Sequence, residues 1–222
     1  MSPTSSPPIW STAVIADAVC AGLRARAEAE DREQVVYGFD HHDELGLHPL
    51  IQQTLRDAGW GVWPEQRYPG HWGKTRKSEG NRCDVVLTER ADVSGLRDPE
   101  IRGTLFDQLP AADPQDAYWL EIKTVAQHTS DGPFRRYTSE LLSPVAHDAR
   151  KLWSDGVIRH AGLLLVLFTA GQEIAGHDMS AWYRKCLERG YPVASPEQRL
   201  FDITDRIGNS CCAVGVFAVR DG

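Results

Sequence analysis

An acid and an amine share one face of a short apolar segment near the middle of the chain. Residues 117–126 read A-Y-W-L-E-I-K-T-V-A, and this aromatic and β-branched composition predicts a strand. Side chains alternate between the two faces of a strand, so Glu121 and Lys123 point the same way and Ile122 points the other way. Burying either charge alone costs several kcal/mol. The two charges therefore either form an ordinary ion pair that is solvated at a sheet edge, or they bind a group that requires both of them.

A second acid stands at the start of the preceding apolar run. Residues 81–90 read N-R-C-D-V-V-L-T-E-R, which predicts another strand. Strict alternation places Asp84 on one face with Val86, and Cys83 on the other face with Val85. At the start of a buried strand, Asp84 either bonds the backbone or joins the charged face of the next strand.

A helix is predicted upstream of both strands, over residues 43–58. It begins with acids, which suit a helix N-terminus, and it stops at Gly59, which suits a C-terminal cap. Pro49 interrupts the pattern, so the helix begins either at the acids or near this proline. If the helix includes the acids, Glu44 and His48 lie four residues apart on one face.

The remaining pattern predicts an α/β domain. The continuous apolar run at 161–170 is typical of a strand that is covered on both faces and reached through a crossover helix. We therefore expect a mixed central β-sheet of about four to five strands flanked by helices. The other expected elements are a helix at 11–33, a strand at 60–69, a helix at 137–153 that Pro144 kinks or restarts, a helix at 180–189, and strands at 199–204 and 211–220.

The chain divides into a tail and one domain. Residues 1–10, rich in Pro and Ser, are expected to be disordered, and residues 11–222 to form a single domain with a long acidic insertion at 91–116. The N-terminus lacks the pattern of a signal peptide, and no apolar stretch reaches membrane-spanning length. Five cysteines without a C-x-x-C pair fit reduced thiols. These features predict a cytoplasmic protein that does not associate with membranes.

The net charge of −7 argues against a polyanionic partner, since phosphate binding draws on lysine and arginine. The distribution of charge weakens that objection. Residues 67–82 carry five basic side chains and one acid, whereas residues 84–116 carry eight acids and three arginines. A basic segment is thus available to contact phosphate, and one hypothesis is that the acidic insertion covers the same groove in place of nucleic acid.

The order of these elements resembles the PD-(D/E)XK nuclease superfamily, which has a restriction-endonuclease-like fold. The resemblance covers residues 43–170. It rests on Asp84 at the start of one strand, the E-x-K of Glu121 and Lys123 on the next, and the helices before and after them. The chain departs from the superfamily pattern at Cys83, where a proline is expected. The resemblance implies an endo- or exonuclease that hydrolyses DNA, with RNA as a further candidate, and leaves a 5′-phosphate and a 3′-hydroxyl.

The same residues predict a metal site. Magnesium takes one or two carboxylates from a protein together with carbonyl and water oxygens. Asp84 and Glu121 supply two carboxylates from neighbouring strands, and the resemblance adds the backbone carbonyl of Ile122 as a ligand of Mg²⁺ or Mn²⁺. It also implies a further acid from the first core helix, which is Glu44, with Asp43 as the alternative.

Other side chains are assigned to catalysis or to the substrate. The resemblance implies that Lys123 orients the attacking water or stabilises the transition state. Glu65 and Gln66, on the first strand, are candidates for the rim of the pocket, and His48 lies one turn after Glu44. The basic residues predicted to contact nucleic acid are Lys74, Arg76, Lys77, Arg82, Arg135 and Arg136.

Two other classes of protein fit the same sequence. One is a catalytically retired, nucleic-acid-binding or scaffold protein of the same fold. The other is a metal-dependent hydrolase of a different phosphate ester, which the net acidity favours slightly. A homodimer is expected if the protein cuts both strands of a duplex with one site in each chain.

Overall fold

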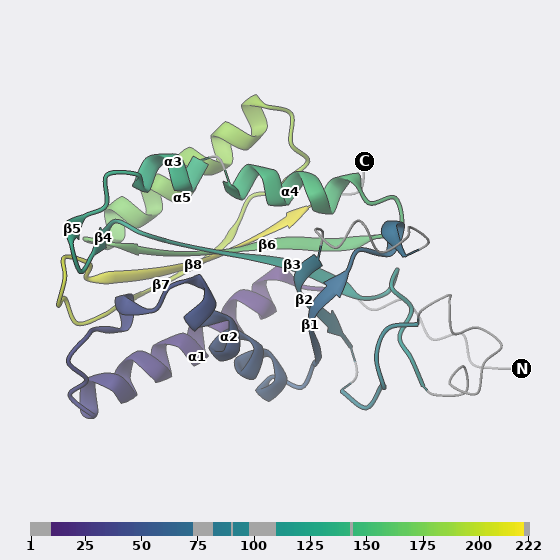
Figure 1. Ribbon diagram of the computed structural model, residues 1–222. Helices are drawn as coiled ribbons and strands as arrows, with labels where there is room; N and C mark the ends of the chain where they lie inside the picture. The colour runs from purple at the N-terminus through teal and green to yellow at the C-terminus, as the bar shows by residue number, and fades with distance from the viewer. Residues whose placement is uncertain (1–9, 73–81, 90, 98–109, 143, 220–222) are drawn as a thin grey trace, which may run out of the picture.

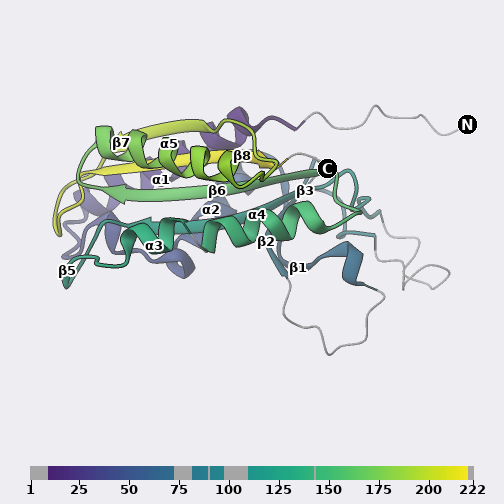
Figure 2. The same ribbon diagram turned by 90° about the horizontal axis from the view of Figure 1, so that it is seen from above.

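Two layers of helices enclose one β-sheet (Figure 1). The computed structural model describes residues 10–72, 82–89, 91–97, 110–142 and 144–219. One face of the sheet is covered by α1 (Thr12–Arg32) and α2 (Glu44–Asp57), and the other by α3 (Tyr137–Leu142), α4 (Pro144–Ser154) and α5 (Gln172–Glu188). Figure 2 looks down on the second layer, in which α5 and the α3–α4 pair lie next to each other. The predicted α/β class with a helix-flanked sheet is confirmed.

The sheet contains six strands in the spatial order β1-β2-β3-β6-β8-β7. Neighbouring strands are antiparallel except β3 and β6, which run parallel, so the sheet is mixed. The strands are β1 (Gly61–Arg67), β2 (Arg82–Thr88), β3 (Tyr118–Ala126), β6 (His160–Thr169), β7 (Glu197–Asp202) and β8 (Cys211–Val219). The expected number of four to five was too low because the C-terminal strand pair joins the main sheet, with β8 running along most of β6.

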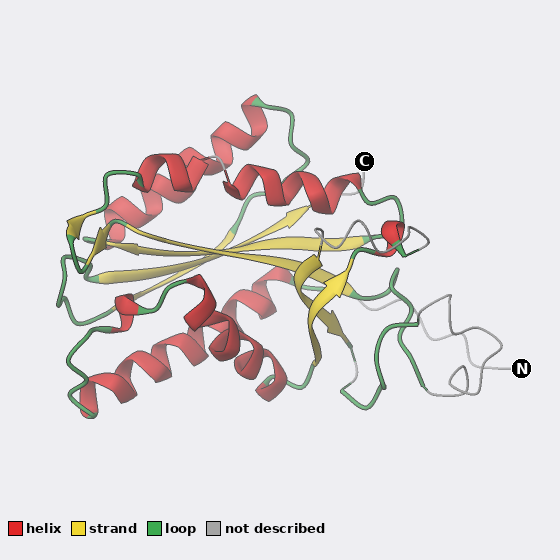
Figure 3. Cartoon of the chain, in the orientation of Figure 1, coloured by secondary structure: helices red, strands yellow, loops and turns green. Residues whose placement is uncertain are grey.

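Short elements fill the connections between these helices and strands (Figure 3). Two 3₁₀ turns, η1 and η2, precede α2 and follow β1, respectively. A separate two-stranded ribbon, β4 and β5, follows β3. Their bounds are Phe39–His41 for η1, Pro69–His71 for η2, His128–Thr129 for β4 and Gly132–Pro133 for β5.

Helix α2 begins at the earlier of its two predicted starts. The side chain of Asp43 caps it by accepting a hydrogen bond from a backbone N–H in the first turn, and Glu44 is the first helical residue. Pro49 lies inside the helix, where a proline removes one backbone hydrogen bond. The fully buried side chains of Leu47 and Ile51 offset that loss by packing into the core.

The helices of the second layer agree with the prediction at Pro144 and differ from it at the start of α5. Pro144 restarts the helix, so the predicted segment 137–153 forms α3 and α4, which carry the chain from β3 across to the parallel strand β6. Helix α5 begins at Gln172, well ahead of the predicted start at residue 180. The upstream part is helical because Ala175 and Met179 are fully buried in the core and extend its apolar stripe.

Alternation along β2 breaks at its first residues. Val85 packs with the α1–α2 layer and Val86 with the opposite layer, as expected. Cys83 was predicted to share the face of Val85, but it lies in the cluster that contains Val86. The β1–β2 ladder is also interrupted here, since among the described residues it has no pair between Glu65 and Asp84. The alternation of side chains between the two faces of the sheet is therefore interrupted at Asp84.

Trp10 does not belong to the disordered tail that was expected at 1–10. Its indole N–H donates to the carbonyl of Asp116 at 2.9 Å, and its ring packs against Tyr118 at 5.5 Å between centroids. Residues 1–9 lie outside the described part of the chain. The described part of the chain thus begins by contacting the segment that leads into β3.

The expected acidic insertion at 91–116 is described only at its two ends. Leu96 forms an isolated parallel bridge with Ala112, which brings these ends together. All five cysteines are free and buried. Among the described helices, none is long and apolar enough to cross a membrane.

Candidate active site

The candidate site lies where β2 and β3 part. The β2–β3 ladder consists of three pairs and ends at Val85–Leu120. The β3–β6 ladder continues along the whole of β3, as far as Ala126–Phe168. Beyond Leu120, β3 therefore has a strand neighbour on one side only, within the described residues. Its other side is open to groups that are not strands.

Two carboxylates occupy this open side of β3. The backbone N–H of Ile122 donates to Asp84 Oδ2 at 2.7 Å, and the N–H of Thr124 donates to Glu44 Oε2 at 3.2 Å. Alternate residues of a strand point their backbone groups to the same side, so these acids take positions that carbonyl groups of a neighbouring strand would otherwise fill. The N–H and C=O of one residue also share a side, so the Ile122 carbonyl faces the same opening.

Glu121 is buried beside Asp84. It is 2% exposed, and Tyr68 donates its hydroxyl hydrogen bond to Glu121 Oε1. Burial and, after it, repulsion from the neighbouring carboxylate of Asp84 raise the pKa of Glu121 from 4.5 to about 9. Lys151 opposes the shift, with its Nζ at 3.8 Å from Glu121 Oε1. The carboxylates of Glu121 and Asp84 thus lie next to each other, and the ammonium group of Lys151 is close to the first of them.

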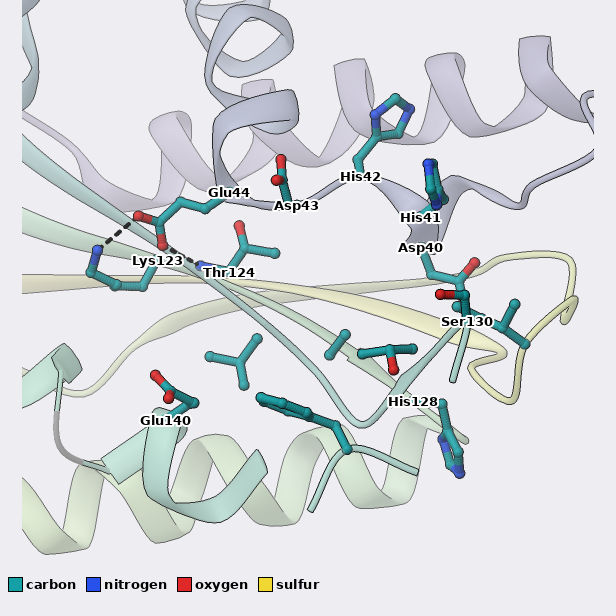
Figure 4. A pocket seen from close by; sticks show the side chains of 15 residues that line it. Asp40, His41, His42, Asp43, Glu44, Lys123, Thr124, His128, Ser130 and Glu140 are labelled. Atoms are coloured by element: carbon teal, nitrogen blue, oxygen red, sulfur yellow. Dashed lines mark hydrogen bonds and ion pairs between the residues drawn. The ribbon is translucent and has the colours of Figure 1, made fainter. Parts of the chain in front are cut away.

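Lys123 is held by acids from both helical layers. Its Nζ lies 2.8 Å from Glu44 Oε1, at the start of α2, and 3.5 Å from Asp148 Oδ2, on α4. Burial lowers the pKa of Lys123, but the hydrogen bond to Glu44 and the charge of Asp148 outweigh it, so this pKa is raised overall. The ammonium group therefore stays charged. Figure 4 shows Glu44 reaching both the Lys123 ammonium and the Thr124 backbone.

Helix α4 supplies two further charged groups, Asp148 and Lys151. They lie three residues apart on one helical face, with 2.6 Å between Lys151 Nζ and Asp148 Oδ1. Asp148 is 4% exposed. Burial lowers the pKa of Lys151, but Glu121 and Asp148 outweigh it and raise this pKa overall. Neither Asp148 nor Lys151 was among the predicted site residues, although their spacing of three residues on the crossover helix after the E-x-K strand could have indicated them.

Three side chains that could together hold a metal ion, here called the metal-ligand group, adjoin these residues. One ligand atom each from His48, Glu65 and Asp84 lies within 4.8 Å of the others, and this is the one such group of three among the described residues. His48 Nε2 is buried and has no hydrogen-bond partner in the described part of the chain. Glu65 has a backbone φ of 54°, which a non-glycine residue adopts only at a cost of about 1–3 kcal/mol. The strain lies where the β1–β2 ladder is interrupted, opposite Asp84.

The predicted metal ligands are thus divided between two positions. Asp84 belongs to the group with His48 and Glu65, and Glu121 lies beside it. Glu44 lies outside this group, and both of its carboxylate oxygens are engaged, one by Lys123 and the other by the β3 backbone. Asp43, the alternative to Glu44, caps α2 instead.

The residues predicted to contact the substrate lie in several environments. Lys74, Arg76 and Lys77 fall outside the described residues. Arg82 is exposed and its guanidinium donates to the carbonyl of Glu65 at 2.9 Å, which places it next to the metal-ligand group. Of the other three assigned side chains, Gln66 bonds the Pro64 carbonyl, Arg135 is exposed, and Arg136 pairs with Glu140 at 2.5 Å.

Comparisons of this chain with models of protein families, with curated proteins and with solved structures find no significant match.

Proposed function

We propose that the chain is a metal-dependent nuclease with a restriction-endonuclease-like core, and that it hydrolyses phosphodiester bonds in DNA. What supports this most is the meeting of Asp84, Glu121 and Lys123 at the point where β2 and β3 separate. The alternative of an ordinary ion pair on an exposed sheet face does not suit Glu121, which is 2% exposed. A carboxylate buried next to another carboxylate is costly unless a further charge compensates it.

The donor groups at this opening fit a divalent cation. Asp84 and Glu65 offer carboxylate oxygens, His48 offers an unpartnered nitrogen, and Glu121 lies beside Asp84. When bound, a divalent ion lowers the pKa of a water ligand and neutralises charge on the phosphate. Carboxylates suit Mg²⁺ and Mn²⁺ alike, while an imidazole ligand favours Mn²⁺. We therefore expect both ions to support activity and His48→Asn to impair use of Mn²⁺ more than use of Mg²⁺.

The remaining groups are assigned roles by their contacts. Lys123, which Glu44 and Asp148 keep charged, orients the attacking water or stabilises negative charge on the phosphate. Glu44 is then a positioning residue for Lys123 rather than a metal ligand. Lys151 reduces the repulsion between Glu121 and Asp84 from the side of α4.

Cleavage assays test the proposal directly. Plasmid, single-stranded DNA and RNA are incubated at low salt with Mg²⁺, with Mn²⁺ or with EDTA. We expect divalent-ion-dependent cleavage that Asp84→Asn lowers by about 10³-fold, since this change removes one carboxylate charge from the site. Glu188→Gln, which removes one carboxylate charge from an exposed ion pair with Lys185, is the matched control and should retain full activity. Full activity of Asp84→Asn, with an unchanged melting curve, would contradict the nuclease proposal.

A noncatalytic, nucleic-acid-binding or scaffold role is the second candidate. The observation that favours it is the closed environment of Glu121, which is hydrogen-bonded by Tyr68 and nearly inaccessible. Calorimetric titration with Mg²⁺ and Mn²⁺ separates the two candidates. A nuclease site should bind the ion and lose that binding in Asp84→Asn, whereas a retired site should give no heat in either protein.

A further inference from the structure

A cavity of about 620 Å³ adjoins the Glu44–Lys123 pair (Figure 4). It is bounded by η1, the start of α2, the half of β3 that lacks β2, and the ribbon segment that follows β3. Its volume falls within the range of pockets that bind small organic molecules. Because Lys123 and Glu44 line it, the cavity opens directly beside the proposed site of cleavage.

Three buried polar atoms in the wall of this cavity lack partners among the described residues; one is His128 Nδ1, and the other two, on Asp40 and Thr124, bear on the occupant. Asp40 Oδ1 and Thr124 Oγ1 are buried and accept or donate no hydrogen bond among the described residues. Asp40 is 4% exposed, and its other oxygen accepts from Asn209 Nδ2 at 2.7 Å, which fixes the carboxylate in place. An unpaired buried polar atom costs about 1–3 kcal/mol. These two atoms therefore favour an occupant that forms hydrogen bonds with them.

The rest of the wall restricts what the occupant is. The lining acids and histidines do not bring three ligand atoms together, since the one such group in the described residues is His48, Glu65 and Asp84, so the wall does not suit a metal ion. Apolar side chains contribute the other surfaces, among them Ala126 and Phe134. The occupant thus combines apolar faces with polar edges, and Lys123 offers a positive charge at one end for a phosphate.

We propose that this cavity receives an unstacked nucleobase, next to the phosphate that lies at Lys123. An exocyclic amino group of the base donates to Asp40 Oδ1, the hydroxyl of Thr124 bonds a second edge atom, and the ring packs against Phe134. Such packing of a base on an aromatic ring contributes about 1–3 kcal/mol. The inference rests on the proposed nuclease function and narrows its substrate, because a base within a duplex reaches such a pocket only after unpairing. The preferred substrates are then single strands and frayed duplex ends.

Nucleotide binding without cleavage tests the cavity. Calorimetry in EDTA compares deoxyadenosine 5′-monophosphate with deoxyribose 5-phosphate, which lacks the base. We expect the nucleotide to bind at least about tenfold more tightly. Thr124→Val removes a hydroxyl that no described residue bonds, so it should leave the melting temperature unchanged and weaken nucleotide binding by about three- to tenfold. Similar binding of the two ligands by the wild type would overturn the proposal.

A matched pair of substitutions checks the location. Ala126→Phe fills the cavity and should abolish the preference for the nucleotide. Ala25→Phe makes the same change on the exposed face of α1 and should leave that preference intact. If Ala126→Phe folds and binds the nucleotide as well as the wild type does, the cavity is not the site.

Cleavage assays separate this inference from the function on which it rests. A wild type that cleaves single strands faster than duplex, and loses the difference in Ala126→Phe, supports the pocket. Equal cleavage of both substrates by wild type and variant would refute the pocket and leave the nuclease intact. A protein that binds the nucleotide in this cavity and cleaves nothing would refute the nuclease and leave the pocket intact.

Discussion

The two halves of β3 differ in what surrounds them. Residues 118–120 pair with β2 on one side and β6 on the other, and their side chains are at most 3% exposed. Residues 121–126 pair with β6 alone among the described strands, and they carry Glu121 and Lys123. We call these the closed half and the open half of β3. One half of this strand thus contributes buried apolar side chains to the core, and the other half carries the charged side chains.

The comparison shows how a strand edge becomes a place for charged groups. In the closed half, backbone N–H groups are satisfied by neighbouring strands, so only apolar side chains are needed. In the open half, N–H groups take carboxylates as acceptors, and those carboxylates attract ammonium groups in turn. The charged cluster therefore follows from the separation of β2 and β3.

The largest expected difference between the halves concerns catalysis. Replacing Lys123 by Met keeps the length and the apolar stem of the side chain and removes its charge. We expect cleavage to fall by about 10³-fold, or about 4 kcal/mol of barrier, with the melting temperature shifted by only a few degrees. Steady-state cleavage rates and thermal melts measure both quantities. Cleavage within about threefold of the wild type would show that the charge of Lys123 in the open half is not needed for catalysis.

The next largest effect belongs to the closed half. The side chain of Leu120 is fully buried in the core on the α1–α2 side of the sheet, so Leu120→Ala should lower the free energy of unfolding by about 2–5 kcal/mol. Denaturant titration measures this change. At low temperature, the folded fraction should cleave normally because the charged groups remain in place. A loss of activity that exceeds the loss of folded protein would show that the halves are not separable.

A smaller effect is expected from the buried acid of the open half. The fold raises the pKa of Glu121 from 4.5 to about 9, so the folded protein retains a proton that the unfolded chain releases between these values. Without divalent ions, stability should therefore decrease as pH rises from about 5 to 9. Glu121→Gln cannot ionise, so its melting temperature in EDTA should fall less over the same range. Parallel pH profiles for the two proteins would contradict the raised pKa.

The smallest effect should come from the positioning acid. Glu44→Gln keeps an acceptor for the Thr124 N–H and removes the charge beside Lys123, so the pKa of Lys123 falls while its ammonium remains in place. We expect activity at neutral pH to fall about tenfold. As the pH is raised further, activity should begin to decrease at a lower pH than in the wild type. Rates measured from pH 7 to 10 test this. A loss as large as that of Lys123→Met would instead assign Glu44 to the metal.

Local patterns in the sequence predict much of this arrangement. Alternation along residues 117–126 places Glu121 and Lys123 on one face, and the acids at residues 43 and 44 mark the start of α2. These properties depend on neighbours in sequence. The pairing of Asp84 with the Ile122 amide also agrees with the expectation that the two strands adjoin, since it arises where their ladder ends.

Other features depend on packing between distant segments and leave no local pattern. Tyr68 meets Glu121 only because β1 and β3 are brought together on either side of β2. Asp148 reaches Lys123 across the layer interface, and from its own helix it resembles any surface acid. Cys83 was placed on the wrong face because strict alternation assumes a regular ladder, which Glu65 and Asp84 interrupt.

The carboxylates on the Ile122 and Thr124 amides cover an edge of β3, and we expect this to discourage pairing with other molecules. An uncapped strand edge is a template for pairing with extended segments of other molecules, and buried charge along such an edge discourages that pairing. A doubly substituted protein lacking both acids would present two adjacent free amide groups beside a continuous apolar strand. We therefore expect a variant that lacks both Asp84 and Glu44 to aggregate more readily than the wild type at high concentration.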